Sequence, residues 1–236
     1  NARLTMRWVY RNEQSPPLPE SAGRWAEELE ISPLLVRHLW QRGLESPEAM
    51  RVFLNPSLKG LAPLTEWPGL EQAAAVLAEA LLAGKKLCVW GDYDVDGITA
   101  TALVIDFLAM HGFEATYHIP DRIEEGYGLN TEAIERLASR GVSLLVTVDC
   151  GISDIAAVSF ARSLGMSVVI SDHHMPGEEL PPADAVVNPR LYYSPCPSLA
   201  GVGVAFLLMA AVNAALHEAG LRKHDLRSLL DLVALG

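Results

Sequence analysis

From Lys85 onward, short apolar runs alternate with longer segments in which apolar residues recur at helical spacing. The short runs predict strands at 85–91, 113–120, 143–149 and 166–172, with 183–188 as a further candidate, and the longer segments predict helices at 98–112, 131–141 and 153–165. Repeated strand–helix–strand units with apolar strands indicate an open, mainly parallel sheet with helices on both faces. The predicted fold class is therefore α/β.

A different pattern precedes this alternation. Residues 1–66 contain Pro16, Pro17 and Pro19 and then the helical segment ISPLLVRHLWQRG, so they predict a small helical extension. A strong helix former follows at 71–83 and ends at Gly84. We expect a second, larger domain over 67–236.

One segment is apolar enough to suggest a membrane span. Residues 199–216 contain no charged side chain, and eighteen apolar-dominated residues meet the minimum length. The segment is rich in Gly and Ala, contains Asn213 and has no strong Lys/Arg flank on one side. We expect a helix buried by protein and no membrane association.

Composition and charge narrow the class of protein. Half of the 236 residues are hydrophobic and a fifth are charged, which is typical of a folded globular chain. The net charge of −11 argues against a basic nucleic-acid coat, although carboxylates that hold cations would make this formal charge misleading. Three cysteines without CxxC spacing predict neither a disulfide framework nor a structural zinc site, and they fit a reducing cytoplasm.

Acidic residues follow three of the predicted strands. Asp92 comes after the strand at 85–91, Asp149 ends the strand at 143–149, and Asp172 ends the strand at 166–172 with His173 and His174 directly behind it. The carboxyl ends of parallel strands share one edge of a sheet, where such folds place their ligand sites. We expect these side chains to converge there, together with Asp94 and Asp96.

A metal centre is the chemistry that this set favours. Carboxylates so close together would repel one another and shift their pKa values unless cations neutralised them. Oxygen and imidazole ligands suit Mn²⁺ or Mg²⁺ better than a thiolate-preferring metal. Two ions about 3.5–4 Å apart could share a carboxylate, activate water and hold a phosphoryl group.

Other interpretations of the same residues are weaker. A single Asp after a strand is more often a helix cap or turn former, but three strand ends together make that interpretation improbable. An EF-hand loop starting at Asp92 would need Glu where Leu103 stands, and a strand rather than a helix precedes it. Cys150 offers a rival thiol nucleophile, but neighbouring carboxylates would raise its pKa.

The ordered motifs DYDVDG (92–97), IPDRIEEGYGLN (119–130), TVDCG (147–151), SDHH (171–174), SLAGVGVAF (198–206) and LLDLVALG (229–236) resemble the DHH phosphoesterase superfamily. Within it they are similar to single-strand-specific 5′→3′ exonucleases. The resemblance implies a two-metal phosphodiesterase, with Mn²⁺ or alternatively Mg²⁺, that hydrolyses single-stranded DNA in recombination and repair.

The resemblance implies that 67–236 form a catalytic domain truncated at its C-terminal end, and it implies roles for individual residues. The metal ligands it implies are Asp94, Asp96, Asp149, His173 and Asp231, with Asp149 as the bridge between ions. The alternative for Asp231 is an exposed acid on a terminal helix. Asp92, Asp172 and His174 are implied as catalytic or supporting residues, Asp172 orienting an imidazole and His174 lying near the scissile phosphate. Arg122 is the candidate for phosphate binding, against the alternative of a surface salt bridge to Glu124 or Glu125.

Two alternatives of function stay open at this stage. The metal core is shared with relatives that cleave short oligoribonucleotides, cyclic dinucleotides or pyrophosphate. A non-catalytic repair or replication scaffold is the alternative from another class, although such a protein would be expected to lose its ligands. The expected partners are single-stranded DNA, a helicase and a single-strand-binding protein, in the cytoplasm.

Overall fold

The computed structural model describes residues 18–236, and residues 1–17 of the predicted extension, with Pro16 and Pro17, lie outside this range. The chain divides into two compact units, the first reaching to Leu61 and the second running from Ala62 to Gly236. The observed boundary lies five residues before the one that we expected after residue 66.

Short helices build the described part of the first unit: α1 (Ala22–Glu28), α2 (Pro33–Gln41) and α3 (Pro47–Leu54). Ser32 and Ser46 cap α2 and α3, each accepting a hydrogen bond from a backbone N–H three residues later, and a proline follows each cap. This is the signal expected at a helix start. Val36, Leu39 and Met50 form a small core of their own.

The second unit is built on a five-stranded parallel sheet in the order β2-β1-β3-β4-β5. The strands are β1 (Leu87–Trp90), β2 (Ala115–His118), β3 (Leu144–Val148), β4 (Ser167–Ser171) and β5 (Ala185–Val187). All five strands, including the candidate at 183–188, lie where the sequence predicted them. The two edge strands are β2 and β5.

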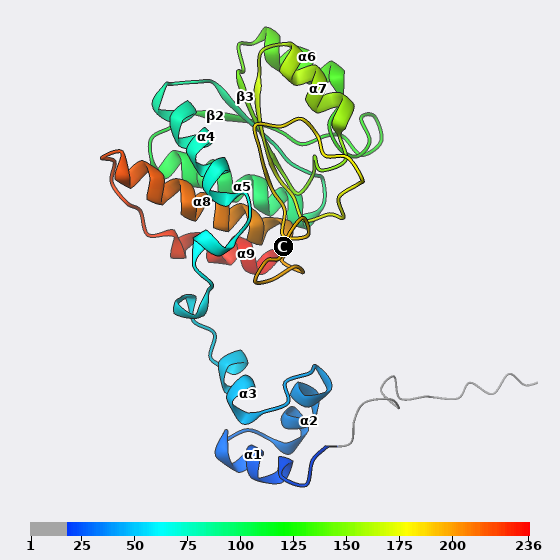
Figure 1. The fold of residues 1–236 in the computed structure, drawn as a ribbon, viewed down its shortest axis with the longest axis vertical. Coiled ribbons are helices and arrows are strands. Elements are labelled where there is room, and N and C mark those ends of the chain that lie inside the picture. The colour runs from blue at the N-terminus through cyan, green and yellow to red at the C-terminus, as the bar shows by residue number, and fades with distance from the viewer. Residues whose placement is uncertain (1–17) are drawn as a thin grey trace, which may run out of the picture. The chain divides into compact units, whose positions relative to one another are not determined.

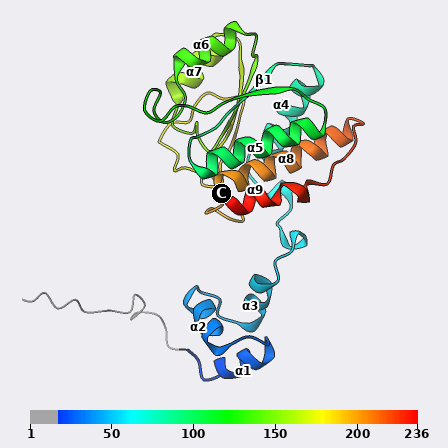
Figure 2. The same ribbon diagram turned by 180° about the vertical axis from the view of Figure 1, so that it is seen from behind.

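Helices cover both faces of this sheet (Figures 1 and 2). On one face α4 (Leu70–Leu82), α5 (Val95–Met110) and α8 (Gly201–Glu218) pack on strand residues such as Val89 and Val146. On the other face α6 (Thr131–Ser139) and α7 (Ile155–Ser163) pack on the alternate residues Trp90 and Leu145. Because successive strand residues point to opposite faces, two separate cores form, and the predicted α/β fold is confirmed.

The remaining elements are short. Within residues 18–236, three 3₁₀ turns occupy Leu58–Gly60, Leu64–Glu66 and Leu226–Leu229, and a short helix α9 spans Leu230–Leu235. Figure 2 shows α9 lying alongside α5 and α8. The bounds of α1, α3 and α9 were not predicted from the sequence.

The apolar segment near residue 200 is helix α8, which is long and apolar enough for a membrane span by length and composition. It packs instead between other elements of the second unit, and most of its apolar side chains are buried in the core shared with α4 and α5. The buried helix expected from the sequence is thus observed.

Gly69 precedes α4 with φ +77°, and a Cβ there would lie 2.1 Å from the carbonyl oxygen of Val186. Gly84, after the same helix, has φ +67° but open space around a Cβ. We predict that Gly84→Ala costs about 1 kcal/mol from backbone strain. Gly69→Ala adds a steric clash that raises the total by a further ~1–3 kcal/mol. Urea denaturation of both variants measures this, and equal losses would contradict the close approach of Gly69 to β5.

Candidate functional site

The carboxyl ends of β1, β3 and β4 bring the predicted acids to one edge of the sheet. These strands are neighbours and parallel, so the residues that follow them lie side by side. Backbone bonds extend the pairing past the strands, because Asp149 N–H donates to Ser171 O (2.9 Å) and Asp172 N–H donates to Val187 O (3.0 Å). The convergence predicted from the sequence is observed.

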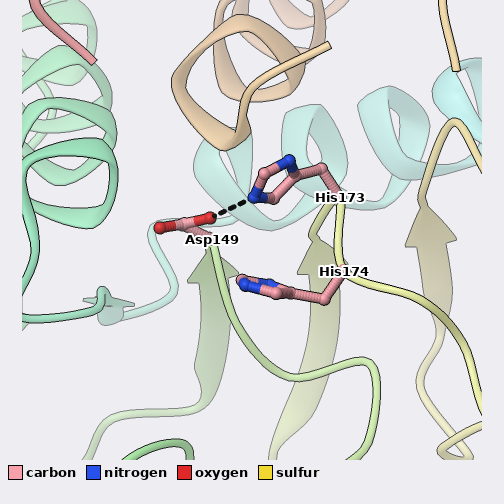
Figure 3. Close-up of side chains that lie close together, drawn as sticks. All are labelled: Asp149, His173 and His174. Atoms are coloured by element: carbon pink, nitrogen blue, oxygen red, sulfur yellow. Dashed lines mark ion pairs between the residues drawn. The ribbon is translucent and has the colours of Figure 1, made fainter. Parts of the chain in front are cut away.

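Asp149 lies at the centre of this edge. Its side chain is 1% exposed, and its backbone adopts φ 61°, a left-handed conformation that is uncommon for a residue other than Gly. Figure 3 shows the imidazole of His173 pointing at this carboxylate, with Nε2 3.1 Å from Oδ1. The atoms form an ion pair but are not aligned for a hydrogen bond, so Oδ1 has no hydrogen-bond partner.

Two groups of ligand-type side chains meet at Asp149. One group contains His173 and His174, and the other contains Asp92 and Asp94. In each group one ligand atom from every residue lies within 4.8 Å of the others. Asp149 belongs to both groups, which is the position expected of a carboxylate shared by two sites.

Asp92 and Asp94 are positioned by the turn between β1 and α5. Asp94 caps α5, because its Oδ1 accepts a hydrogen bond from Gly97 N–H (3.0 Å). Asp92 is 4% exposed and packs against Gly97, where a Cβ would lie 2.6 Å from atoms of Asp92. Its Oδ1 is buried and has no hydrogen-bond partner. A glycine at position 97 therefore allows this carboxylate to sit inside the turn.

Asp96 has a different principal contact from the one that we expected. Its two carboxylate oxygens accept hydrogen bonds from Gly201 N–H (2.7 Å) and Val202 N–H (2.6 Å), the first amides of α8. Helix α8 has no side-chain cap of its own, so Asp96 satisfies its free N–H groups and its positive end. Asp96 also lies 3.6 Å from His173 Nε2, but it belongs to neither ligand group.

Asp172 forms hydrogen bonds with His173 and His174, and it belongs to neither group of possible metal ligands. Its Oδ1 lies 2.8 Å from His174 Nδ1 and accepts from the backbone N–H of His173 and His174, while Oδ2 accepts from Ile152 N–H. Burial raises the pKa of Asp172, but the bonds from His174 and Ile152 outweigh it and keep the pKa below its usual value. The predicted orienting contact between Asp172 and an imidazole is thus present.

The pKa values of Asp149 and Asp92 are raised, which indicates that too little positive charge lies near these carboxylates. Burial, with a contribution from neighbouring Asp96 and Asp94, raises the pKa of Asp149 to about 6, although His173 opposes the shift. Burial also raises the pKa of Asp92, and the charge of Asp94 adds to it. Contact with Asp149 raises the pKa of His173. A cation bound here would favour the ionised carboxylates.

The geometry fits a hard divalent ion. Adjacent ligands of an octahedral ion with bonds of about 2.1 Å lie roughly 3 Å apart, close to the separation of Asp149 Oδ1 and His173 Nε2. The oxygens of Asp92 and Asp149 that lack hydrogen-bond partners are the atoms that such an ion would need. A Cβ on Gly201 would lie 2.4 Å from Asp149 Oδ1, so glycine here leaves room for this carboxylate.

Cys150 does not have the properties of a nucleophile. Its side chain is buried, and burial raises the pKa of the thiol well above its usual value, with Asp172 and other carboxylates adding to the effect. A reactive thiolate needs an exposed and electropositive setting. The structure therefore disfavours the thiol alternative.

Arg122 lies on the exposed loop between β2 and α6, with its guanidinium carbon 5.2 Å from the ring centroid of Tyr93. Within residues 18–236 it forms no ion pair with Glu124 or Glu125, and Glu125 instead pairs with His118 and Arg136. The surface salt bridge considered as the alternative is thus absent from the described residues.

Several residues that support the site were missed in the sequence. Asp154 accepts a hydrogen bond from Leu129 N–H (3.1 Å) and packs on Gly128, which ties down the loop that carries Arg122. The Tyr127 hydroxyl lies 3.2 Å from His174 Nδ1. Tyr127 stands within a quoted motif, whereas Asp154, near the start of a helix, resembles an ordinary cap.

Asn188 and Arg190 were also missed. They bind the backbone carbonyls of the histidine loop, the segment that contains His173 and His174. Asn188 donates through Nδ2 to His174 O (2.9 Å), and Arg190 donates through Nε to His173 O (2.7 Å). A signal existed for Asn188, because it follows β5 as the acids follow their strands.

Asp231 is not brought to this edge by any described contact. It is exposed in the first turn of α9, its Oδ1 accepts a hydrogen bond from Leu232 N–H, and it belongs to neither ligand group. Its role as a ligand stays a prediction without structural support.

Known proteins resemble this chain in sequence and in fold. The single-stranded-DNA-specific exonuclease RecJ of Dickeya dadantii is 45% identical over 214 residues, which cover 86% of this chain and 36% of the relative. The chain thus spans about a third of that protein's length.

Two solved structures support the same likeness. A crystal structure of exonuclease RecJ bound to manganese matches with a TM-score of 0.66 and 40% identity, over 74% of this chain and 43% of that one. RecJ of Thermus thermophilus in complex with Mn²⁺ matches with a TM-score of 0.70 and 33% identity, over 93% of this chain and 30% of that one.

The family model described as "DHH family, N-terminal domain" matches residues 86–236, a range that includes all five strands and every candidate ligand named above. The chain therefore belongs to the DHH family.

Proposed function

We propose that this chain is the catalytic part of a metal-dependent exonuclease that hydrolyses single-stranded DNA in the 5′→3′ direction, in recombination and repair. The observation that carries the proposal is Asp149, buried at the meeting point of two ligand groups, with an oxygen that has no hydrogen-bond partner. The relatives named as single-stranded-DNA-specific exonucleases support the choice of substrate. No contact among residues 18–236 favours a non-catalytic scaffold.

The residues proposed to hold divalent ions are Asp94, Asp149 and His173. Asp92 and His174 lie in the same two groups and are proposed as supporting residues. We propose two ions, Mn²⁺ or Mg²⁺, that share Asp149. Such ions polarise phosphoryl oxygens and lower the pKa of bound water. Asp96 stands beside them, and its carboxylate fixes the start of α8 against this edge. A ligand role for Asp96 would require these backbone bonds to be shared or released.

His174 is proposed to face the scissile phosphate. Asp172 holds its Nδ1, and this contact raises the pKa of His174 above its usual value. With Nδ1 held by Asp172, Nε2 is the ring nitrogen left to face a phosphate oxygen. The Tyr127 hydroxyl lies 3.2 Å from Nδ1, and burial raises the pKa of Tyr127, so the phenol stays protonated.

The partners beyond DNA follow only from the resemblance. A helicase and a single-strand-binding protein, and the cytoplasm as the location, stay predictions. The opposed possibility of a short RNA or cyclic dinucleotide substrate is tested by comparing hydrolysis rates on these compounds with the rate on single-stranded DNA.

The first prediction of this function concerns Asp149 and metal. We expect Asp149→Asn to abolish Mn²⁺-dependent hydrolysis of single-stranded DNA and to lower Mn²⁺ affinity more than Asp92→Asn or Asp94→Asn does, because only Asp149 belongs to both ligand groups. Titration calorimetry with Mn²⁺ measures the affinity.

Asp106→Asn is the matched control, since Asp106 is exposed on α5 and belongs to neither ligand group. It should leave activity unchanged. Excess chelator should stop the wild-type reaction, added Mn²⁺ should restore it, and full activity in chelator would refute the metal site.

The second prediction concerns Arg122. If its guanidinium binds a DNA phosphate, Arg122→Ala should raise the KM for a 5′-phosphorylated strand about tenfold or more, and Arg122→Lys should recover only part of the loss because Lys lacks the bidentate fork. The melting temperature should not change, because the side chain is exposed.

A strand with a 5′-hydroxyl separates two phosphates as the target of Arg122. A smaller effect of the substitution on this strand identifies the terminal phosphate, and an equal effect identifies an internal one. Unchanged kinetics of Arg122→Ala on both strands would show that the arginine does not bind the substrate.

A further inference from the structure

The segment that joins β5 to α8 has both of its ends at the candidate site. It begins with Asn188 directly after β5 and ends at Gly201, which contacts Asp96 and Asp149. The segment therefore starts and ends at the edge where the strand ends gather.

The first part of this segment is a fixed loop. Asn188 Oδ1 accepts a hydrogen bond from Arg190 N–H (2.8 Å), and the hydroxyl of Ser194, which is only 3% exposed, donates to Pro189 O (2.9 Å). These bonds close residues 189–194 on themselves. The residues between them are held at the tip of a short and ordered turn.

Arg190 connects this loop to the histidines. Its Nε donates a hydrogen bond to His173 O. The residue is exposed, so the two terminal nitrogens of the guanidinium can bind a phosphate. Within residues 18–236 it forms no ion pair. Tyr192 is two residues further on, so its Cα lies within about 7 Å of the Cα of Arg190.

Tyr192 and Tyr193 stand at the tip of the loop with 68% and 90% of their surface exposed. Side chains this exposed contribute little to the protein's own packing. Two adjacent tyrosines beside a cation, on a turn held rigid at a site rich in carboxylates, have the composition of a surface on which nucleic-acid bases stack.

The positions of two arginines favour a nucleic-acid strand as the occupant. The net charge of −11 does not attract a phosphate backbone, so individual cations at this edge carry the argument. Arg122 follows edge strand β2, and Arg190 follows edge strand β5, so the two arginines stand toward opposite ends of the edge that holds Asp149. Four steps between five strands separate these edges by about 19 Å. Tyr192 and Tyr193 follow Arg190 in the chain, so they would meet a strand at the Arg190 end of a path between the two arginines.

We propose that Tyr192 and Tyr193 form a base-stacking surface that holds the single strand beside the site of cleavage, with Arg190 facing a phosphate of the same strand. The inference rests on the proposed function, because it assumes that the substrate is single-stranded. It assigns substrate binding to a loop that contributes no member of either ligand group.

The test uses the complete protein and a short 5′-phosphorylated oligothymidylate. Tyr192→Ala with Tyr193→Ala should weaken binding, measured by fluorescence anisotropy in chelator, by about 5- to 100-fold, the range for losing one stacked base. In Mn²⁺ the KM should rise more than kcat falls. Replacing both residues by Phe should keep the wild-type affinity, because the ring is what stacks.

Two comparisons isolate stacking from other effects. Tyr117→Ala, at an exposed tyrosine on the opposite edge strand, should leave affinity unchanged. An oligomer with abasic sites should bind the wild type and the alanine variant equally, because it has no bases to stack. Mn²⁺ affinity should be the same in all variants.

The outcomes separate the two proposals. A wild type that neither binds nor cleaves the strand refutes the proposed function. A wild type that does so, with unchanged affinity in the Tyr192→Ala, Tyr193→Ala variant, refutes the stacking surface alone. The inference is also overturned if the double alanine variant loses affinity equally for abasic and for normal strands.

Discussion

The site depends on one electrostatic constraint: carboxylates that follow neighbouring strand ends lie close together, and some of them are buried. Asp92 and Asp149 are buried, each has an oxygen without a hydrogen-bond partner, and burial raises the pKa of both. Desolvation and mutual repulsion oppose the ionised state of such a group. A bound divalent cation removes both penalties, and this is the physical reason for expecting metal here.

The rest of the fold supports this arrangement. The parallel sheet places the strand ends in register, and the left-handed backbone at Asp149 turns its carboxylate toward His173. Asp96 binds the first amides of α8, so the buried helix of one core begins at the site itself. Asp172 and Asn188 hold the histidine loop by its side chain and backbone. Stability and site geometry therefore rely on the same contacts.

The sequence predicted the sheet and the convergence of acids well, because apolar periodicity and strand-end position are local signals. The contact of Asp172 with His174 was also expected. What could not be predicted were contacts that depend on the approach of distant elements. The bond from Gly201 to Asp96 spans 105 residues, and Asp154 reaches a loop 25 residues away. The order of residue types along a chain does not specify which distant backbone N–H will donate to a given carboxylate.

For the same reason the contacts of Asp96 and Asp231 could not be predicted from their motifs, and their roles as metal ligands stay predictions. Asp96 is close to His173 but is occupied by backbone amides, and Asp231 is exposed on a short helix. Spacing within a motif fixes the order of residues along the chain, whereas the direction of each side chain depends on the elements packed against it.

The central claim is that divalent ions bind between Asp149 and the residues around it. The most direct measurement is an anomalous difference map from crystals of the protein soaked in Mn²⁺. The account predicts two peaks about 3.5–4 Å apart, both within bonding distance of Asp149. A map in which saturating Mn²⁺ gives no peak at this edge of the sheet, or in which the peaks avoid Asp149, would contradict it.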